Sequence, residues 1–167
     1  MQDKTYNVLF LCTGNSARSI MAEAILNVLG KGRFRAYSAG SHPSGQVQPV
    51  AKELAAAIGY DASQVRSKNW DEFAVEGAPE MDMVITVCDN AAGESCPLWL
   101  GHPALAHWGV ADPVSATGDE DAKRRAYTAA FATLRRRIEL LLSLPLDKLD
   151  RLAAQGKLRE IGKVGAE

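Results

Sequence analysis

The sequence is poor in cysteine. It holds three cysteines in 167 residues, and this small, odd number argues against the disulfide framework that stabilises many small secreted domains. The N-terminal residues are too polar for a secretory signal peptide. We therefore expect a cytoplasmic protein whose thiols are reduced.

Long apolar runs and an excess of one charge are also missing. No apolar stretch approaches the roughly 20 residues that a membrane-spanning helix needs. The net charge of -1 gives no reason to expect nucleic acid or a membrane surface as a partner. The histidines, His42, His102 and His107, show no metal-ligand spacing with the cysteines. We expect no metal site and no other cofactor.

Strand-like and helix-like segments alternate along the chain. Its 47% hydrophobic and 23% charged residues are typical of one globular domain. Apolar runs predict strands at 8–11, 34–38, 83–87 and 104–108, and helical spacing predicts helices at 19–29, 49–58, 70–74 and 119–142. This order predicts an α/β fold with a four-stranded parallel sheet, in which ligands bind beyond the carboxyl ends of the strands.

The last part of the chain follows these segments. Leucines at helical spacing after residue 145 predict an amphipathic helix. We assign residues 1–145 to the main domain and residues 146–167 to a C-terminal helical extension, for which we expect a role in packing or association.

The loop between the first strand and the first helix reads "CTGNSAR". Unpaired N–H groups at a helix start, the helix dipole and the charge of Arg18 together favour a tetrahedral oxyanion. Gly14 and Asn15 tolerate the left-handed backbone of a curled loop. The same positive field should lower the pKa of the Cys12 thiol, and Ser19 can donate a hydrogen bond to the thiolate. The expected oxyanion-binding residues are Thr13, Gly14, Asn15, Ser16, Ala17 and Arg18.

A cysteine at the end of a strand is more often a small buried apolar residue than a nucleophile. C-x5-R alone is also a loose pattern. The position between a predicted strand and a predicted helix, with Gly-Asn inside the loop and Ser19 directly after Arg18, favours the functional interpretation.

The stretch "CTGNSARS", from Cys12 to Ser19, resembles the phosphate loop of the low-molecular-weight protein tyrosine phosphatases and of the arsenate reductases that share their fold. The resemblance runs from about Tyr6 to Leu142. "AYSAG", "MDMVITVCD" and "HWGVADP" resemble the second strand, the third strand and the acid-bearing loop of the reductase branch. The resemblance implies a flavodoxin-like three-layer fold.

The resemblance also implies that Asp112 is a general acid that protonates the leaving oxygen. An Asp-Pro pair is otherwise a common turn signal. In the tyrosine-specific phosphatases the residue after this pair is usually aromatic, and here it is Val114. This departure favours a small oxyanion over an aryl phosphate.

The other two cysteines, Cys88 and Cys96, fit a reductase better than a phosphatase. After Cys12 has formed an adduct with arsenate, Cys88 can attack the Cys12 sulfur and expel arsenite, and Cys96 can then attack Cys88. The alternative is one core cysteine and one incidental surface cysteine. Some family members carry a further cysteine where this chain has Ala17.

In some of these reductases a potassium ion lies near the loop, held partly by residues that resemble Asn15, Glu23 and Ser38. Lys68 stands where those relatives supply an aspartate. We expect its ammonium group to replace the cation, so that no specific potassium requirement remains.

These observations predict an arsenate reductase that uses arsenate as substrate, with phosphate or sulfate as competing oxyanions. Thioredoxin, glutaredoxin or a small thiol is the expected electron donor. The alternatives are a phosphatase for phosphomonoesters and a redox or oxyanion sensor without turnover. Cys88 and Cys96 distinguish the reductase from the phosphatase, and Asp112 distinguishes both enzymes from the sensor.

Overall fold

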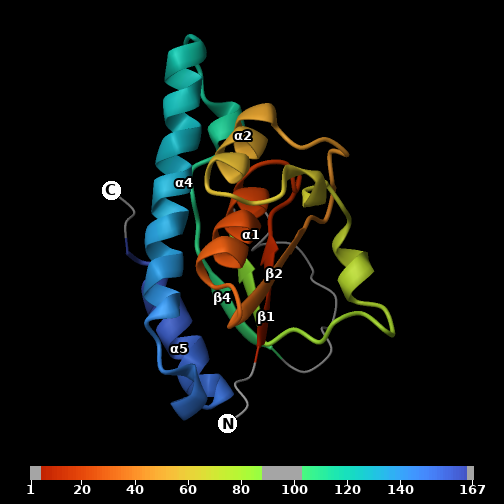
Figure 1. The fold of residues 1–167 in the computed structure, drawn as a ribbon, viewed down its shortest axis with the longest axis vertical. Helices are drawn as coiled ribbons and strands as arrows, with labels where there is room; N and C mark the ends of the chain where they lie inside the picture. The colour runs from red at the N-terminus through yellow and green to blue at the C-terminus, as the bar shows by residue number, and fades with distance from the viewer. Residues whose placement is uncertain (1–4, 88–102, 165–167) are drawn as a thin grey trace.

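The centre of the molecule is a four-stranded parallel sheet in the order β2-β1-β3-β4 (Figure 1). The computed structural model describes residues 5–87 and 103–164. The strands are β1 (Tyr6–Leu11), β2 (Phe34–Ala39), β3 (Met83–Thr86) and β4 (Ala104–His107). The predicted strands and the predicted parallel sheet are thereby confirmed, with boundaries that differ by one or two residues.

The helices are α1 (Arg18–Leu29), α2 (Pro49–Ala57), α4 (Glu120–Leu142) and α5 (Arg151–Ile161). Four 3-10 turns are η1 (Ala62–Gln64), η2 (Trp70–Phe73), η3 (Pro113–Ser115) and η4 (Leu146–Lys148). Local sequence explains several starts. The side chains of Asp119 and Asp150 accept hydrogen bonds from the first turns of α4 and α5, and α2 begins with a proline at its first position.

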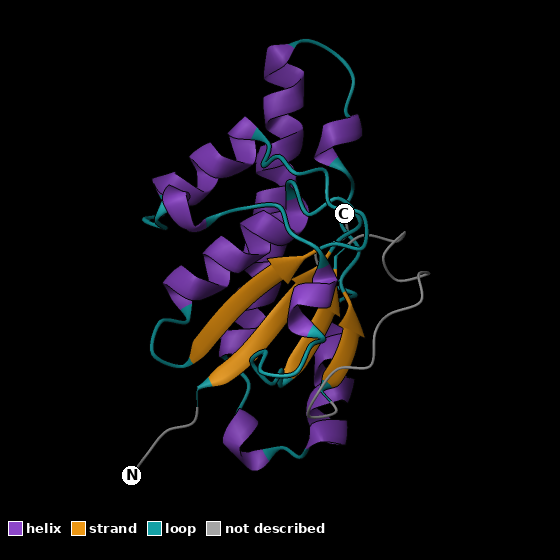
Figure 2. Cartoon of the chain, turned by 90° about the vertical axis from the view of Figure 1, so that its right-hand side faces the viewer, coloured by secondary structure: helices purple, strands orange, loops and turns teal. Residues whose placement is uncertain are grey.

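Apolar side chains cover both faces of the sheet, which explains the nearly continuous apolar character of β1. On one face, residues such as Val8 and Ile85 join a core with α1, α4 and α5. On the other face, Leu9 and Leu11 pack with Trp70 and Phe73 of η2. Figure 2 shows the sheet with the long helices behind it and the short η2 segment in front.

The carboxyl ends of all four strands meet at one edge. Leu11 is in register with Ala39 of β2 and with Thr86 of β3, and Thr86 is in register with His107 of β4. Because β1 lies between β2 and β3, the chain reverses its winding direction beside β1, where α/β folds bind ligands. Cys12 follows β1 directly. Among the helices in the described ranges, none is long and apolar enough to cross a membrane.

Candidate active site

Cys12 lies at the bottom of the loop that joins β1 to α1. It is only 6% exposed, and its N–H donates to the Ala39 carbonyl over 3.2 Å. Helix α1 begins at Arg18, and no side chain of the described residues caps it. Its first turn also contains no acidic residue, so the positive end of the helix dipole is not neutralised locally.

The carbonyl groups of the loop are bound from outside it. The acceptors are Thr13, Gly14 and Ser16, whose oxygens receive N–H groups from His42, Ser44 and Gln48 at 2.9, 3.0 and 2.9 Å, respectively. The Ser67 hydroxyl also donates to the Gly14 carbonyl over 3.2 Å. Carbonyls that are engaged in this way do not oppose an anion, because their partial negative charge is already satisfied by N–H groups outside the loop.

Gly40, the first residue after β2, allows this close packing. A Cβ atom at this position would lie 2.4 Å from the Thr13 oxygen and 2.6 Å from the Cys12 oxygen. Both are backbone atoms that cannot rotate away. Only glycine therefore lets the end of β2 approach the loop so closely.

Asn15 carries the positive φ that a curled loop requires, with a value of 44°. Of the two residues expected to do so, it is Asn15 and not Gly14 that adopts this conformation. Its buried amide donates to the Ser19 hydroxyl over 2.8 Å and accepts the Lys68 N–H over 2.8 Å. Since Ser19 accepts this bond, its own proton is available to another acceptor.

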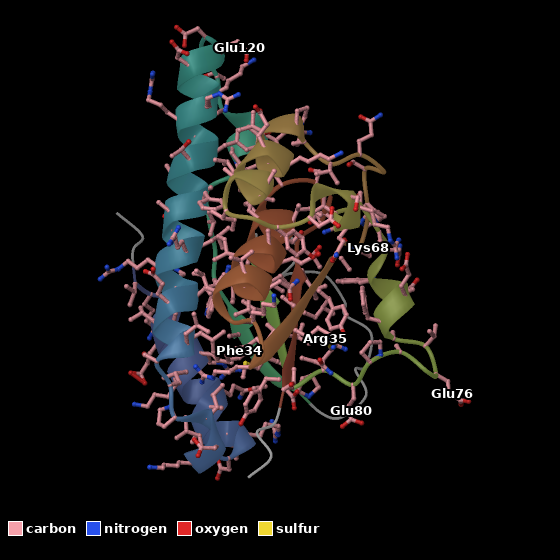
Figure 3. All side chains as sticks on the ribbon, viewed as in Figure 1. Phe34, Arg35, Lys68, Glu76, Glu80 and Glu120 are labelled. Carbon is pink, nitrogen blue, oxygen red and sulfur yellow. The ribbon has the colours of Figure 1, made fainter. Side chains whose placement is uncertain are left out.

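Lys68 forms the centre of a buried polar cluster beside the loop, and Figure 3 labels it on the segment between β2 and η2. Its ammonium group donates to the carbonyls of Ser38 and Arg66, each over 2.9 Å, and lies 3.9 Å from a Glu23 oxygen. Glu23 also accepts the Ser38 hydroxyl at 2.5 Å and the Tyr60 hydroxyl at 2.6 Å. The contacts expected of Lys68 from the sequence are present.

Burial controls the proton equilibria in this cluster. It lowers the pKa of Lys68, while the charge of Glu23 acts in the opposite direction. Burial, followed by the charge of Glu23, raises the pKa of Tyr60 far above its usual range. Tyr60 therefore remains a neutral donor to Glu23 at any ordinary pH.

Asp112 lies opposite Arg18. The Arg18 guanidinium donates to the Val110 carbonyl over 2.9 Å, and its other terminal nitrogen lies 3.6 Å from an Asp112 oxygen. Asp112 also accepts the Val114 N–H over 2.9 Å, so it forms the turn and faces Arg18 at the same time. Its side chain is 37% exposed, against 14% for Arg18.

A model of the family described as low molecular weight phosphotyrosine protein phosphatase matches residues 7–155. The chain belongs to this family. The family expected from the sequence is confirmed, and so is the phosphatase-like α/β fold.

Proteins that are similar to this chain include both enzyme types. The arsenate reductase of Bacillus subtilis is 37% identical over 70% of this chain and 80% of its own length. A solved arsenate reductase in a phosphate-bound state is 27% identical, with a TM-score of 0.67, over 83% of this chain and 97% of its own. A low-molecular-weight protein tyrosine phosphatase from T. tengcongensis is 26% identical, with a TM-score of 0.65, over 86% and 99%.

Two of the expected catalytic cysteines of this family member, Cys88 and Cys96, lie outside the described residues. The backbone that leads to Cys88 is described up to Val87, whose N–H donates to the Leu11 carbonyl over 2.8 Å. Leu11 directly precedes Cys12.

Tyr127 on α4 is a residue that sequence reasoning missed. Its hydroxyl donates to the Gln48 side chain over 3.4 Å. Burial and, to a lesser extent, the negative charge of Asp112 raise the pKa of Tyr127. In the sequence, Tyr127 falls on the apolar face of the predicted helix, where nothing distinguishes it from a core residue.

Proposed function

We propose that this family member is an arsenate reductase that works through Cys12, Cys88 and Cys96. The observation that carries the proposal is its similarity to curated arsenate reductases over about four fifths of their length. Arg18 and Asp112 contribute the anion clamp and the acid that the first chemical step needs.

In the first step the Cys12 thiolate attacks arsenic. A sulfur–arsenic bond forms and an arsenic–oxygen bond breaks, and the departing oxygen leaves as water after Asp112 supplies a proton. Arg18 and the loop N–H groups hold the remaining oxygens, while Ser19 donates to the thiolate before attack. In this role Thr13 to Ala17 provide the oxyanion-binding backbone.

In the second step the Cys88 thiolate attacks the Cys12 sulfur. A disulfide forms, and the electron pair of the sulfur–arsenic bond stays on arsenic, which leaves as arsenite. The hydrogen bond from the Val87 N–H to the Leu11 carbonyl supports this assignment, because it joins the end of the described β3 segment, which precedes Cys88 in the sequence, to the end of the strand that precedes Cys12. Cys96 then attacks Cys88, which frees Cys12 and leaves a Cys88–Cys96 disulfide for an external dithiol to reduce.

The reaction consumes two electrons in each turnover, so a thiol donor is required. Thioredoxin fits best, because a dithiol protein can reduce a disulfide carried to Cys88 and Cys96, whereas a glutathione-type donor would resolve the Cys12 adduct itself. A reducing compartment such as the cytoplasm suits this chemistry. Phosphate and sulfate compete with arsenate because they are tetrahedral oxyanions of similar size.

A phosphatase is the second candidate, because Cys12, Arg18 and Asp112 can also hydrolyse a phosphomonoester. Its support is the structural similarity to the phosphatase from T. tengcongensis. Val114, which is 47% exposed, does not provide the aromatic wall that an aryl phosphate prefers.

The test is an assay of arsenite production by the purified protein with thioredoxin and its reductase, and separately with glutathione and glutaredoxin. We expect arsenite with the thioredoxin system and inhibition by phosphate. If neither donor supports arsenite formation while phosphate esters are hydrolysed, the phosphatase replaces the reductase. If neither reaction occurs and arsenate still binds, the protein is a sensor.

A further inference from the structure

The C-terminal extension covers the open edge of the sheet. Among the described strands β4 is the last in the order, so within residues 5–87 and 103–164 no further strand pairs with the outer backbone groups of Leu105. The Gln155 side chain of α5 accepts the Leu105 N–H over 2.9 Å, and Arg159 donates to the Leu105 carbonyl over 3.3 Å. Side chains of α5 thus take the place of a fifth strand.

We define residues 109–112 as the acid loop. The extension packs closely against the residues that precede this loop. The indole N–H of Trp108 donates to the Leu158 carbonyl over 2.8 Å. At Gly162 a Cβ atom would lie 2.5 Å from the His107 oxygen. The end of α5 is thus in close contact with His107 and Trp108, which directly precede the acid loop.

Arg137 joins the extension to the acid loop. Its side chain is 1% exposed, and it donates to the Val164 carbonyl over 2.9 Å and to the Gly109 carbonyl over 3.0 Å. Burial lowers the pKa of this guanidinium, and within residues 5–87 and 103–164 no carboxylate forms an ion pair with it. The two carbonyls therefore stabilise a buried positive charge. Loss of either hydrogen bond would leave this charge insufficiently solvated and would destabilise the fold.

Packing alone does not hold the acid loop in place. A cavity of about 310 Å³ lies between the loop and α4, and small residues of α4 such as Ala126 and Ala129 line it. With open space on this side, polar contacts fix the loop instead. Arg18 binds it at Val110, and Arg137 binds it at Gly109.

We propose that Arg137, supported by Val164 of the extension, is a positioning residue that holds the acid loop so that Asp112 can deliver its proton. The inference rests on the proposed role of Asp112 as proton donor. In the part of the chain that the structure describes, the Arg137 hydrogen bonds go to Val164 and Gly109 and not to the loop that holds the oxyanion, so Arg137 acts through Gly109. The role predicts a loss in the rate of proton-assisted chemistry without a loss of arsenate binding.

The test uses the full chain, reduced beforehand and mixed rapidly with arsenate in the absence of any donor, and it measures the rate of arsenite release in one turnover. Arg137→Met removes the charge and both donors at similar length. We expect this rate to fall about 10- to 100-fold, the range for a misplaced catalytic group. The dissociation constant for arsenate should stay within about 2-fold of the wild-type value, because Arg18 and the loop are intact.

A double-mutant cycle with Asp112 distinguishes a positioning role of Arg137 from a general loss of structure. The double variant Arg137→Met with Asp112→Asn should be no slower than Asp112→Asn alone, within about 2-fold, since an acid that is absent cannot be misplaced. Arg137→Lys keeps the charge and can still donate to one of the two carbonyls. Its rate should therefore lie between those of the wild type and Arg137→Met. If Arg137→Met does not fold, the cycle is measured with Arg137→Lys.

Arg33→Met is the matched control, because Arg33 also donates to a backbone carbonyl, but to that of Leu142 at the C-terminal end of α4 and not to one of the acid loop. Its turnover rate should equal that of the wild type. The inference is wrong if Arg137→Met keeps the wild-type rate while Asp112→Asn is slow, or if the two effects multiply. A wild-type rate for Asp112→Asn overturns the proposed role of Asp112 instead. If the wild type releases no arsenite, the same variants are compared by their rates of phosphate ester hydrolysis.

Discussion

The nucleophile loop, residues 12–19, and the acid loop lie at the same edge of the sheet but are held in different ways. The first is half-buried, with Cys12 and Ser19 buried, and hydrogen bonds from segment 42–48, Ser67 and Asn15 fix it on several sides. The second lies above a cavity, and two arginines from distant parts of the chain hold it. Binding and attack therefore depend on a rigid motif, whereas proton delivery depends on long-range contacts.

The largest expected effect comes from the nucleophile loop. Cys12→Ser should lower arsenite production by at least ~10⁴-fold, because a hydroxyl at this position is not ionised at neutral pH. The variant should still bind arsenate, since Arg18 and the loop backbone remain. In the wild type, alkylation of Cys12 should be rapid at slightly acidic pH and should slow when phosphate is added. Measurable turnover by Cys12→Ser, or alkylation that ignores phosphate, contradicts the assignment.

The acid loop should show a smaller loss. Asp112→Asn keeps the shape and the turn-forming acceptor but removes the transferable proton, so single-turnover arsenite release and any phosphate ester hydrolysis should each fall by about 10²- to 10⁴-fold. Equal rates for the wild type and the variant, at equal thermal stability, reduce Asp112 to a turn residue.

Lys68 tests how far the nucleophile loop depends on its buried support. Lys68→Ala leaves Glu23 without its cation in a buried site, and breaking such a pair costs about 3 kcal/mol of unfolding free energy. Urea unfolding measures this loss. Potassium chloride should restore part of the stability of Lys68→Ala and leave the wild type unchanged. An equal response of both proteins argues that Lys68 does not replace a cation.

Gly40 tests the close approach of β2 to the loop. Gly40→Ala places a Cβ atom against two backbone oxygens, and overpacking of this kind costs about 1–3 kcal/mol. Arsenate affinity should fall as the loop shifts. The matched control is Gly156→Ala in α5, where a Cβ meets nothing within 4 Å and helix propensity should raise stability by up to about 1 kcal/mol. Similar melting temperatures for the wild type and Gly40→Ala contradict the steric account.

The sequence was sufficient to predict the structural features that are formed by residues adjacent in the chain. Apolar runs and helical spacing predicted the strands and helices, because these patterns are local and the parallel sheet is covered on both faces. The loop from Cys12 to Ser19 was also predictable, since a helix start, an arginine and a cysteine are adjacent in the chain. The same is true of Lys68, although only through the resemblance to known relatives.

The parts that depend on long-range contacts were not predictable in the same way. The binding of Val110 by Arg18 spans 92 residues, and no spacing in the sequence reveals it. Arg137 left a weak signal: it falls on the same helical face as Leu134, Ile138 and Leu141, where a charged residue needs a buried partner. Its partners, the carbonyls of Gly109 and Val164, are backbone atoms that carry no sequence signature.

The relay of thiols is the central claim, and mass spectrometry of peptides after one pulse of arsenate tests it most directly. In Cys96→Ser a single turnover should release arsenite and leave a Cys12–Cys88 disulfide that accumulates, because no third thiol resolves it. Cys88→Ser should release no arsenite, yet should still hydrolyse an artificial phosphate ester. A wild type that forms no disulfide among Cys12, Cys88 and Cys96 after arsenate, while it hydrolyses phosphate esters rapidly, contradicts the account.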